Sequence, residues 1–218
     1  MRLLIRNRLC VGLLASTLLG FSLAQAASDL SLESAHAVNE GPLHFLATPP
    51  AKAVHHHQNR IRIGPDSLAS GWVGLSQCHD HIDPVPSAQI SFREGKVREL
   101  KIDLASGIGK AWVEGASVQL QAVEPGARLC LSLQTRALHK VGPGRFNLVN
   151  GPYMRKFLDG YYPMRVTLEV DYPVGTLSLV DVNPAPQPGL SLFEQPGNIR
   201  LEAVFEGELR TLIRFAQP

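Results

Sequence analysis

The strongest constraint on the fold is the way in which apolar residues alternate with polar ones in short runs that end at glycine or proline. In residues 118–122 the apolar side chains alternate with glutamines, and in residues 129–134 three leucines alternate with smaller or polar residues. A period of two over four to eight residues is typical of a β-strand with one buried face. The sequence predicts further strands of this kind at 55–63, 72–78, 88–93, 97–104, 108–113, 166–170, 177–182, 199–205 and 209–215.

Tight turns, and no long helical stretch, separate these strands. The order of Glu124, Pro125 and Gly126 suits a type II turn. One short helix is predicted over 152–158, with Pro152 in its first turn and Gly160 after its end. The pattern favours an all-β fold, an antiparallel β-sandwich that is immunoglobulin-like in general architecture, with a closed β-barrel as the alternative. We expect one such domain over 53–218.

The amino-terminal residues 1–26 are typical of a secretory signal peptide. Three arginines precede an apolar run over 9–23, and Ala24-Gln25-Ala26 provides a small-x-small cleavage site. Cleavage after Ala26 lowers the number of Lys and Arg from 21 to 18 against 19 Asp and Glu, so the mature net charge is −1. We therefore expect a periplasmic or secreted protein with no nucleic-acid partner and no stable membrane span after cleavage. Residues 27–52 are expected to form a poorly structured leader.

Two cysteines, Cys78 and Cys130, remain after cleavage. An even number of cysteines in an exported chain predicts one disulfide bond between them. Each cysteine is out of phase with the aliphatic residues of its own strand. The bridge is therefore expected on the sheet face opposite the aliphatic residues, unlike the bridge that crosses the core of an immunoglobulin domain.

Histidines are concentrated at two positions in the chain. His79, His81 and Asp83 share the parity of one strand face, and His79 and His81 would lie about 7 Å apart along it. His55 and His57 could complete a ligand shell if their strand pairs nearby. Nitrogen and oxygen donors predict Zn²⁺ or Cu²⁺ as the ion. The alternative, which the commonness of His-x-His favours, is a polar loop whose histidines bond to backbone or water.

A second segment, residues 150–165, concentrates tyrosine, arginine and methionine. Exposed tyrosine and arginine are typical of binding surfaces. The alternative is a cap that closes one end of the sandwich. The predicted partner surface consists of Tyr153, Arg155, Lys156, Tyr161, Tyr162 and Arg165.

Catalytic motifs are lacking in the sequence. There is no Gly-x-Ser-x-Gly, Ser-x-x-Lys, His-Glu-x-x-His or Cys-x-x-Cys-His pattern. We therefore assign no catalytic residues and no cofactor other than the Zn²⁺ or Cu²⁺ considered above. The sequence favours a non-enzymatic binding or assembly module with an envelope protein as partner. The alternatives are a metal-dependent enzyme that uses His79 and His81, and a carbohydrate-binding module.

Overall fold

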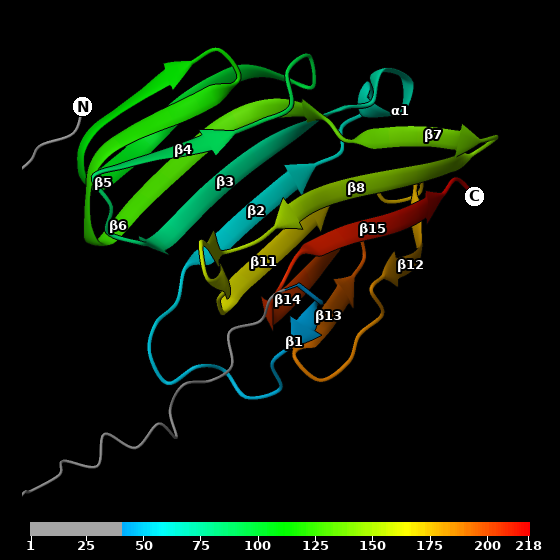
Figure 1. The fold of residues 1–218 in the computed structure, drawn as a ribbon. Coiled ribbons are helices and arrows are strands. Elements are labelled where there is room, and N and C mark those ends of the chain that lie inside the picture. The colour runs from blue at the N-terminus through cyan, green and yellow to red at the C-terminus, as the bar shows by residue number, and fades with distance from the viewer. Residues whose placement is uncertain (1–40) are drawn as a thin grey trace, which may run out of the picture. The chain divides into compact units, whose positions relative to one another are not determined.

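The structure, a computed structural model, describes residues 41–218, which form strands over most of their length (Figure 1). The predicted signal peptide, 1–26, and the first part of the predicted leader lie outside the described residues. The elements are β1 His44–Phe45, β2 His56–Arg62, α1 Ser67–Ser70, β3 Trp72–Ile82, β4 Ser87–Ser91, β5 Val97–Glu114, β6 Ser117–Arg136, β7 Leu138–Gly142, β8 Arg145–Tyr153, β9 Lys156–Phe157, β10 Gly160–Tyr161, β11 Met164–Asp171, β12 Ser178–Asn183, β13 Leu190–Gln195, β14 Asn198–Glu206 and β15 Leu209–Ala216.

Two open sheets make up most of the fold. The larger one has the order β1-β14-β11-β2-β3-β6-β4, with β13 also paired to β14 and β5 to β6. The smaller one has the order β12-β15-β8-β7, and β9 and β10 form a separate hairpin. Every pairing is antiparallel except that of β2 with β11, which is parallel. The β-sandwich prediction is therefore confirmed, and the closed barrel is not formed.

One apolar core fills the space between the two sheets. Figure 1 shows β8 and β15 lying in front of β2, β11 and β14. Side chains in phase on each strand are buried there, which is the expected consequence of a period of two. Among the most deeply buried of them are Leu148 on β8, Leu168 and Val170 on β11, Ile199 and Phe205 on β14, and Ile213 and Phe215 on β15.

The long hairpin of β5 and β6 differs from the predicted strands. Their 18 and 20 residues were expected as two short strands each, with a turn at 124–126. The strands instead stay paired through a bend, and Figure 1 shows them turning back at one side of the larger sheet. Gly107 has φ +65°, and a Cβ there would lie 3.2 Å from the Cα of Ala127. Glycine thus permits the close approach that the bend requires.

The helix predicted over 152–158 is wrong. Residues up to Tyr153 continue β8, where Tyr153 lies opposite Leu209, and β9 follows almost at once. Burial of Tyr153 between the sheets, at 2% exposure, outweighs the local preference that Pro152 suggested. The helix α1 and the β7–β8 pair were not anticipated.

The disulfide prediction is confirmed. Cys78 and Cys130 lie directly opposite each other on β3 and β6, and their sulfurs are bonded at 2.12 Å. The adjacent Leu129 and Leu131 are buried on the other face, while both cysteines are partly exposed. The bridge therefore joins neighbouring strands of one sheet on the face away from the core, as the phase of the cysteines indicated.

Two further findings concern the leader and the membrane. Strand β1 lies within the predicted leader, and it pairs with the end of β14 through His44 and Phe45. Within residues 41–218 no helix has the length and apolar character needed to span a membrane.

Candidate functional site

Strands β2 and β3 bring three histidines together between the sheets. Their antiparallel register places His57 opposite His79, and His55 directly precedes β2. The ring centroids of His57 and His79 are 4.2 Å apart, and those of His55 and His79 are 5.2 Å apart. We call His55, His57 and His79 the histidine cluster. It unites residues 24 positions apart in the chain.

Hydrogen bonds fix the protonation of His79. The side-chain amide nitrogen of Gln77 lies 2.6 Å from Nε2 of His79, and an amide nitrogen can only donate. Nε2 of a neutral His79 is then the acceptor, so its proton is on Nδ1. Nδ1 donates to Nε2 of His55 at 2.9 Å. The amide of Gln77 thus selects one tautomer and orients the ring.

His57 begins a second chain of hydrogen bonds. Its Nε2 donates to Oδ1 of Asn59 at 3.0 Å. Nδ2 of Asn59 in turn donates to the Tyr153 hydroxyl at 3.0 Å and to Oδ1 of Asn150 at 3.5 Å. No buried side-chain polar atom among residues 41–218 lacks a partner. The cluster is therefore a satisfied polar network, a state that buried polar groups require.

Burial keeps all three imidazoles neutral at neutral pH. Desolvation lowers the pKa of His55 to about 4 and that of His57 to about 3. The pKa of His79 is also well below the usual value, first because of burial and then because of the neighbouring His57 and His55. The charged form of each ring would lose its hydration without gaining an acidic hydrogen-bond partner. Neutral rings keep the lone pairs that metal binding or proton transfer needs.

An ion pair between Asp83 and Arg155 lies beside the cluster. Nη2 of Arg155 is 2.6 Å from Oδ1 of Asp83, and Nε is 2.9 Å from Oδ2. Both charges act on the pKa of His55, the carboxylate raising it and the guanidinium lowering it. Arg155 also donates to the main-chain oxygen of Pro163 at 3.3 Å. The pair thus fastens the segment that carries β9 and β10 to the end of β3.

The structure separates His81 from the other predicted ligands, and it pairs Asp83 with Arg155 beside the cluster. His81 has φ +54° at a β-bulge between Asp80 and Ile82, so its exposed side chain does not share the inner face with His79. His81 instead lines a small pocket of about 190 Å³ that also includes His56 and Arg165. His79 and His81 were predicted to share one strand face, and they do not because the bulge adds one residue to β3. Within 41–218 no group of three or more His, Cys, Asp or Glu side chains is arranged to hold a metal ion.

The predicted partner surface is also divided. Tyr153 is buried in the network, and Arg155 is held by Asp83. Arg165 pairs with Glu202 on β14, away from the rest. Lys156, Tyr161 and Tyr162 remain together on the β9–β10 hairpin.

Sequence reasoning missed Asn59 and Gln77. Asn59 is in phase with Ile61 and Ile63, and Gln77 is in phase with Val73 and Leu75. A polar residue at an apolar phase of a strand is the signal that could have revealed the network. Leu158 and Phe157, which the cap alternative would bury at the end of the sandwich, instead lie at the tip of the hairpin with exposed fractions of 109% and 39%.

Comparisons with known proteins give little further information. No protein-family model matches the chain, and no curated protein matches it significantly. Among solved structures, the chain is similar to a two-domain M1 zinc metallopeptidase, an E323A mutant bound to L-tryptophan, with a TM-score of 0.40 and 13% identity. The match covers 82% of this chain and 44% of the peptidase.

Proposed function

We propose that this protein is an exported, non-enzymatic β-sandwich module that docks onto an envelope protein through its β9–β10 hairpin. The observation that carries this proposal is the complete exposure of Leu158 at the hairpin tip, beside the exposed ring of Phe157. Single exposed apolar residues are ordinary, but here two adjacent ones share a hairpin with Tyr161 and Tyr162. Aromatic residues and arginine are enriched where proteins bind each other.

The hairpin is held in one arrangement before any partner arrives. The guanidinium of Arg155 lies 5.5 Å from the ring centroids of both Phe157 and Tyr162, and its ion pair with Asp83 anchors it. The ammonium of Lys156 lies 5.0 Å from the ring centroid of Tyr161. A surface that is ordered in advance loses less conformational entropy on binding.

Site-specific photocrosslinking in cells tests this docking. A photoreactive phenylalanine analogue at Leu158 is expected to yield a discrete crosslinked protein, because the tip is the contact. The matched control is the same analogue at Val174, which is 69% exposed in a different turn. Purified partner should then bind the wild type and bind a Leu158→Ser variant at least tenfold more weakly. No crosslink at Leu158, or equal crosslinks at both positions, would contradict the proposal.

A second candidate function is binding of Zn²⁺ or Cu²⁺ by the histidine cluster. The specific observation in its favour is that three neutral imidazoles contact one another with Gln77 and Asn59 as orienting partners. The nitrogens of His55 and His79 bond to each other, so an ion would have to replace that hydrogen bond and reorient the rings. A metal-dependent enzyme built on His79 and His81 has less support, because the two side chains do not lie on one face.

Calorimetric titration separates the metal candidate from docking. Wild-type protein should bind Zn²⁺ or Cu²⁺ below millimolar concentration, and a His55→Ala/His79→Ala variant should not. His81→Ala is the matched control, because this exposed histidine lies outside the cluster. Absence of binding to the wild type, or equal loss in the His81 variant, would rule out the cluster as the site and leave the hairpin proposal untouched.

A further inference from the structure

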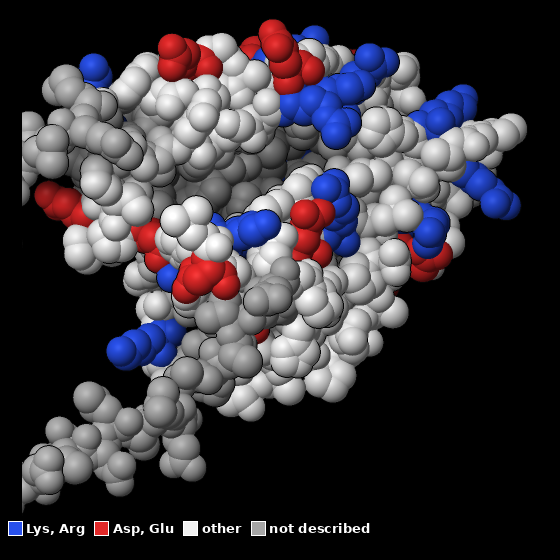
Figure 2. Space-filling view, in the orientation of Figure 1, with Lys and Arg blue, Asp and Glu red and all other residues white. Residues whose placement is uncertain are grey.

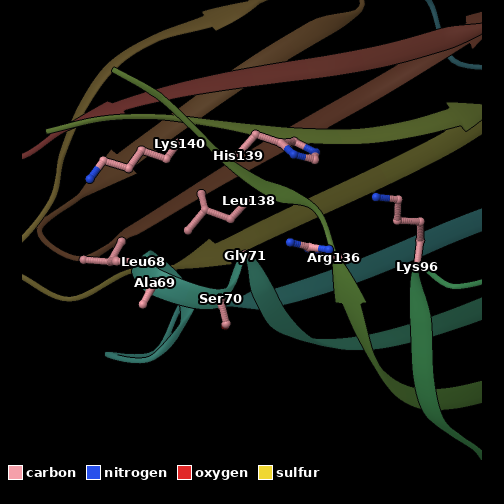
Figure 3. Close-up of a pocket in the computed structure, with 9 residues that line it drawn as sticks. All are labelled: Leu68, Ala69, Ser70, Gly71, Lys96, Arg136, Leu138, His139 and Lys140. Atoms are coloured by element: carbon pink, nitrogen blue, oxygen red, sulfur yellow. The ribbon is translucent and has the colours of Figure 1, made fainter. Parts of the chain in front are cut away.

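A basic pocket lies at the opposite end of β3 from the histidine cluster. It has a volume of about 330 Å³ and forms where α1, the start of β5, the end of β6 and β7 meet. Figure 3 shows its lining, which consists of Leu68, Ala69, Ser70, Gly71, Lys96, Arg136, Leu138, His139 and Lys140. The lining contains three cationic side chains and no carboxylate.

The main chain holds two of these cations next to each other. The backbone N–H of Arg136 donates to the main-chain oxygen of Lys96 at 3.0 Å, one residue beyond the paired Val97 and Thr135. Like charges opposite each other on neighbouring strands destabilise a sheet. None of the ion pairs among residues 41–218 includes Lys96 or Arg136. The fold therefore keeps an unfavourable pair of charges that an anion would relieve.

The floor of the pocket is built by close packing. Gly71 has φ +77°, and a Cβ there would lie 2.7 Å from the main-chain oxygen of Leu138 and 3.5 Å from Cγ of Arg136. The N–H of Leu138 donates to the main-chain oxygen of Gly71 at 3.2 Å. Only glycine allows α1 to end this close to the connection between β6 and β7. This packing fixes the backbone from which Arg136 extends.

The side chains of Lys96, Arg136 and His139 occupy one part of the pocket. Figure 3 shows their ends on the same side, whereas the ammonium group of Lys140 points the other way. Figure 2 shows Lys and Arg gathered over this region of the surface, with acidic residues to one side of them. The carboxylate of Glu99 on β5 already accepts a hydrogen bond from the side-chain amide of Gln134 at 3.0 Å.

We propose that this pocket binds a phosphate-bearing ligand through Arg136 and Lys96. A guanidinium matches two phosphate oxygens at once, and an ammonium adds a second positive charge without a fixed geometry. The ring of His139 supplies a further nitrogen to the same group. The volume lies at the lower end of the range for small-molecule sites, so the ligand is a small phosphate ester or a phosphorylated headgroup.

Calorimetric titration with pyrophosphate, and co-sedimentation with phosphatidic acid vesicles against phosphatidylcholine vesicles, test the proposal. We expect wild-type protein to bind at least one of the two phosphate probes below millimolar concentration, and more weakly as salt increases. Arg136→Gln and Lys96→Gln should each weaken that binding about tenfold, the loss expected for one charge-assisted hydrogen bond. Circular dichroism checks that both variants are folded.

The matched controls are Lys101→Gln on β5 and Arg145→Gln on β8, two exposed cations outside the pocket. Binding of pyrophosphate with loss only in the pocket variants supports a free phosphate ester. Binding only to phosphatidic acid vesicles with the same pattern of loss supports a lipid headgroup. If neither probe binds, or if the controls weaken binding as much as the pocket variants, the pocket is not a phosphate site and the proposal is overturned.

Discussion

The two ends of β3 carry polar groups of contrasting kinds. Near one end, His79 and its two partners are neutral and largely buried, and no buried polar side-chain atom among residues 41–218 lacks a partner. At the other end, Arg136 lies opposite Trp72 with its charge unpaired beside Lys96. Buried groups lose their charge because a charge without hydration is costly. Exposed like charges can stay together because water weakens their repulsion. Protonation of the histidine cluster would therefore destabilise the fold. In the basic pocket, the repulsion between the unpaired cations destabilises the fold until an anion binds.

The disulfide lies between these two ends and should give the largest effect. Cys78 and Cys130 are separated by 52 residues, and a loop of that length corresponds to about 4 kcal/mol of unfolding free energy in the chain-entropy description. We expect Cys78→Ser/Cys130→Ser to lose that amount in urea denaturation at neutral pH. An unchanged denaturation midpoint would show that sheet pairing alone holds β3 against β6.

The pH dependence of stability should come next in size, and the cluster should contribute most of it near neutral pH. His55 and His57 have folded-state pKa values of about 4 and about 3, below the 6.5 of an unfolded histidine, and the pKa of His79 is also lowered. The unfolded chain therefore binds more protons at mildly acidic pH. Stability is complete above pH 6.5 and decreases as the pH falls towards 4.

Each such histidine can contribute up to about 1.4 kcal/mol per pH unit, less for the partly exposed His55 and His57. Urea denaturation at pH 7, 6 and 5 in the presence of a chelator measures this slope. His79→Gln should flatten it, because this ring is the most deeply buried of the three. Equal slopes in the wild type and the His79→Gln variant would mean that the buried rings are not the cause.

Breaking the hydrogen-bond network without changing any charge should have an intermediate effect. Asn59→Leu removes the acceptor of His57 and the donor to Tyr153 while keeping a similar volume. A buried polar group left without a partner costs about 1–3 kcal/mol, and we expect a loss in that range. Tyr153→Phe is the milder comparison, because it removes one acceptor and leaves the ring in place. If both variants are as stable as the wild type, the network does not restrain the ends of β2 and β3.

Relieving the repulsion in the basic pocket should give the smallest effect, and in the opposite direction. Lys96→Glu places a carboxylate next to Arg136, and we expect a gain of about 0.5 kcal/mol at low salt. The gain should disappear at high salt, because exposed charges are screened. The melting temperature at two salt concentrations measures it. Destabilisation at low salt would show that the two cations are not close enough to repel each other.

The sequence by itself determined the fold class and the disulfide. The period of two in runs such as 129–134 places leucines on one face whatever the strand pairs with, so a sheet with one buried face follows. The same phase placed Cys78 and Cys130 away from the core. The face on which each side chain lies depends only on its neighbours in the chain, and two cysteines after the expected cleavage can form only one bridge within the chain; the structure confirms the sandwich and the bridge.

Tertiary structure alone decided which polar residues meet. His55 approaches His79 only because β2 pairs with β3 in one register, and β2 also pairs in parallel with β11 from more than 100 residues away. A single bulge turned His81 away from His79, although the two share a parity in the sequence. Lys96 and Arg136 became neighbours through the pairing of β5 with β6. Register and bulges depend on packing between distant strands, which a local pattern does not encode.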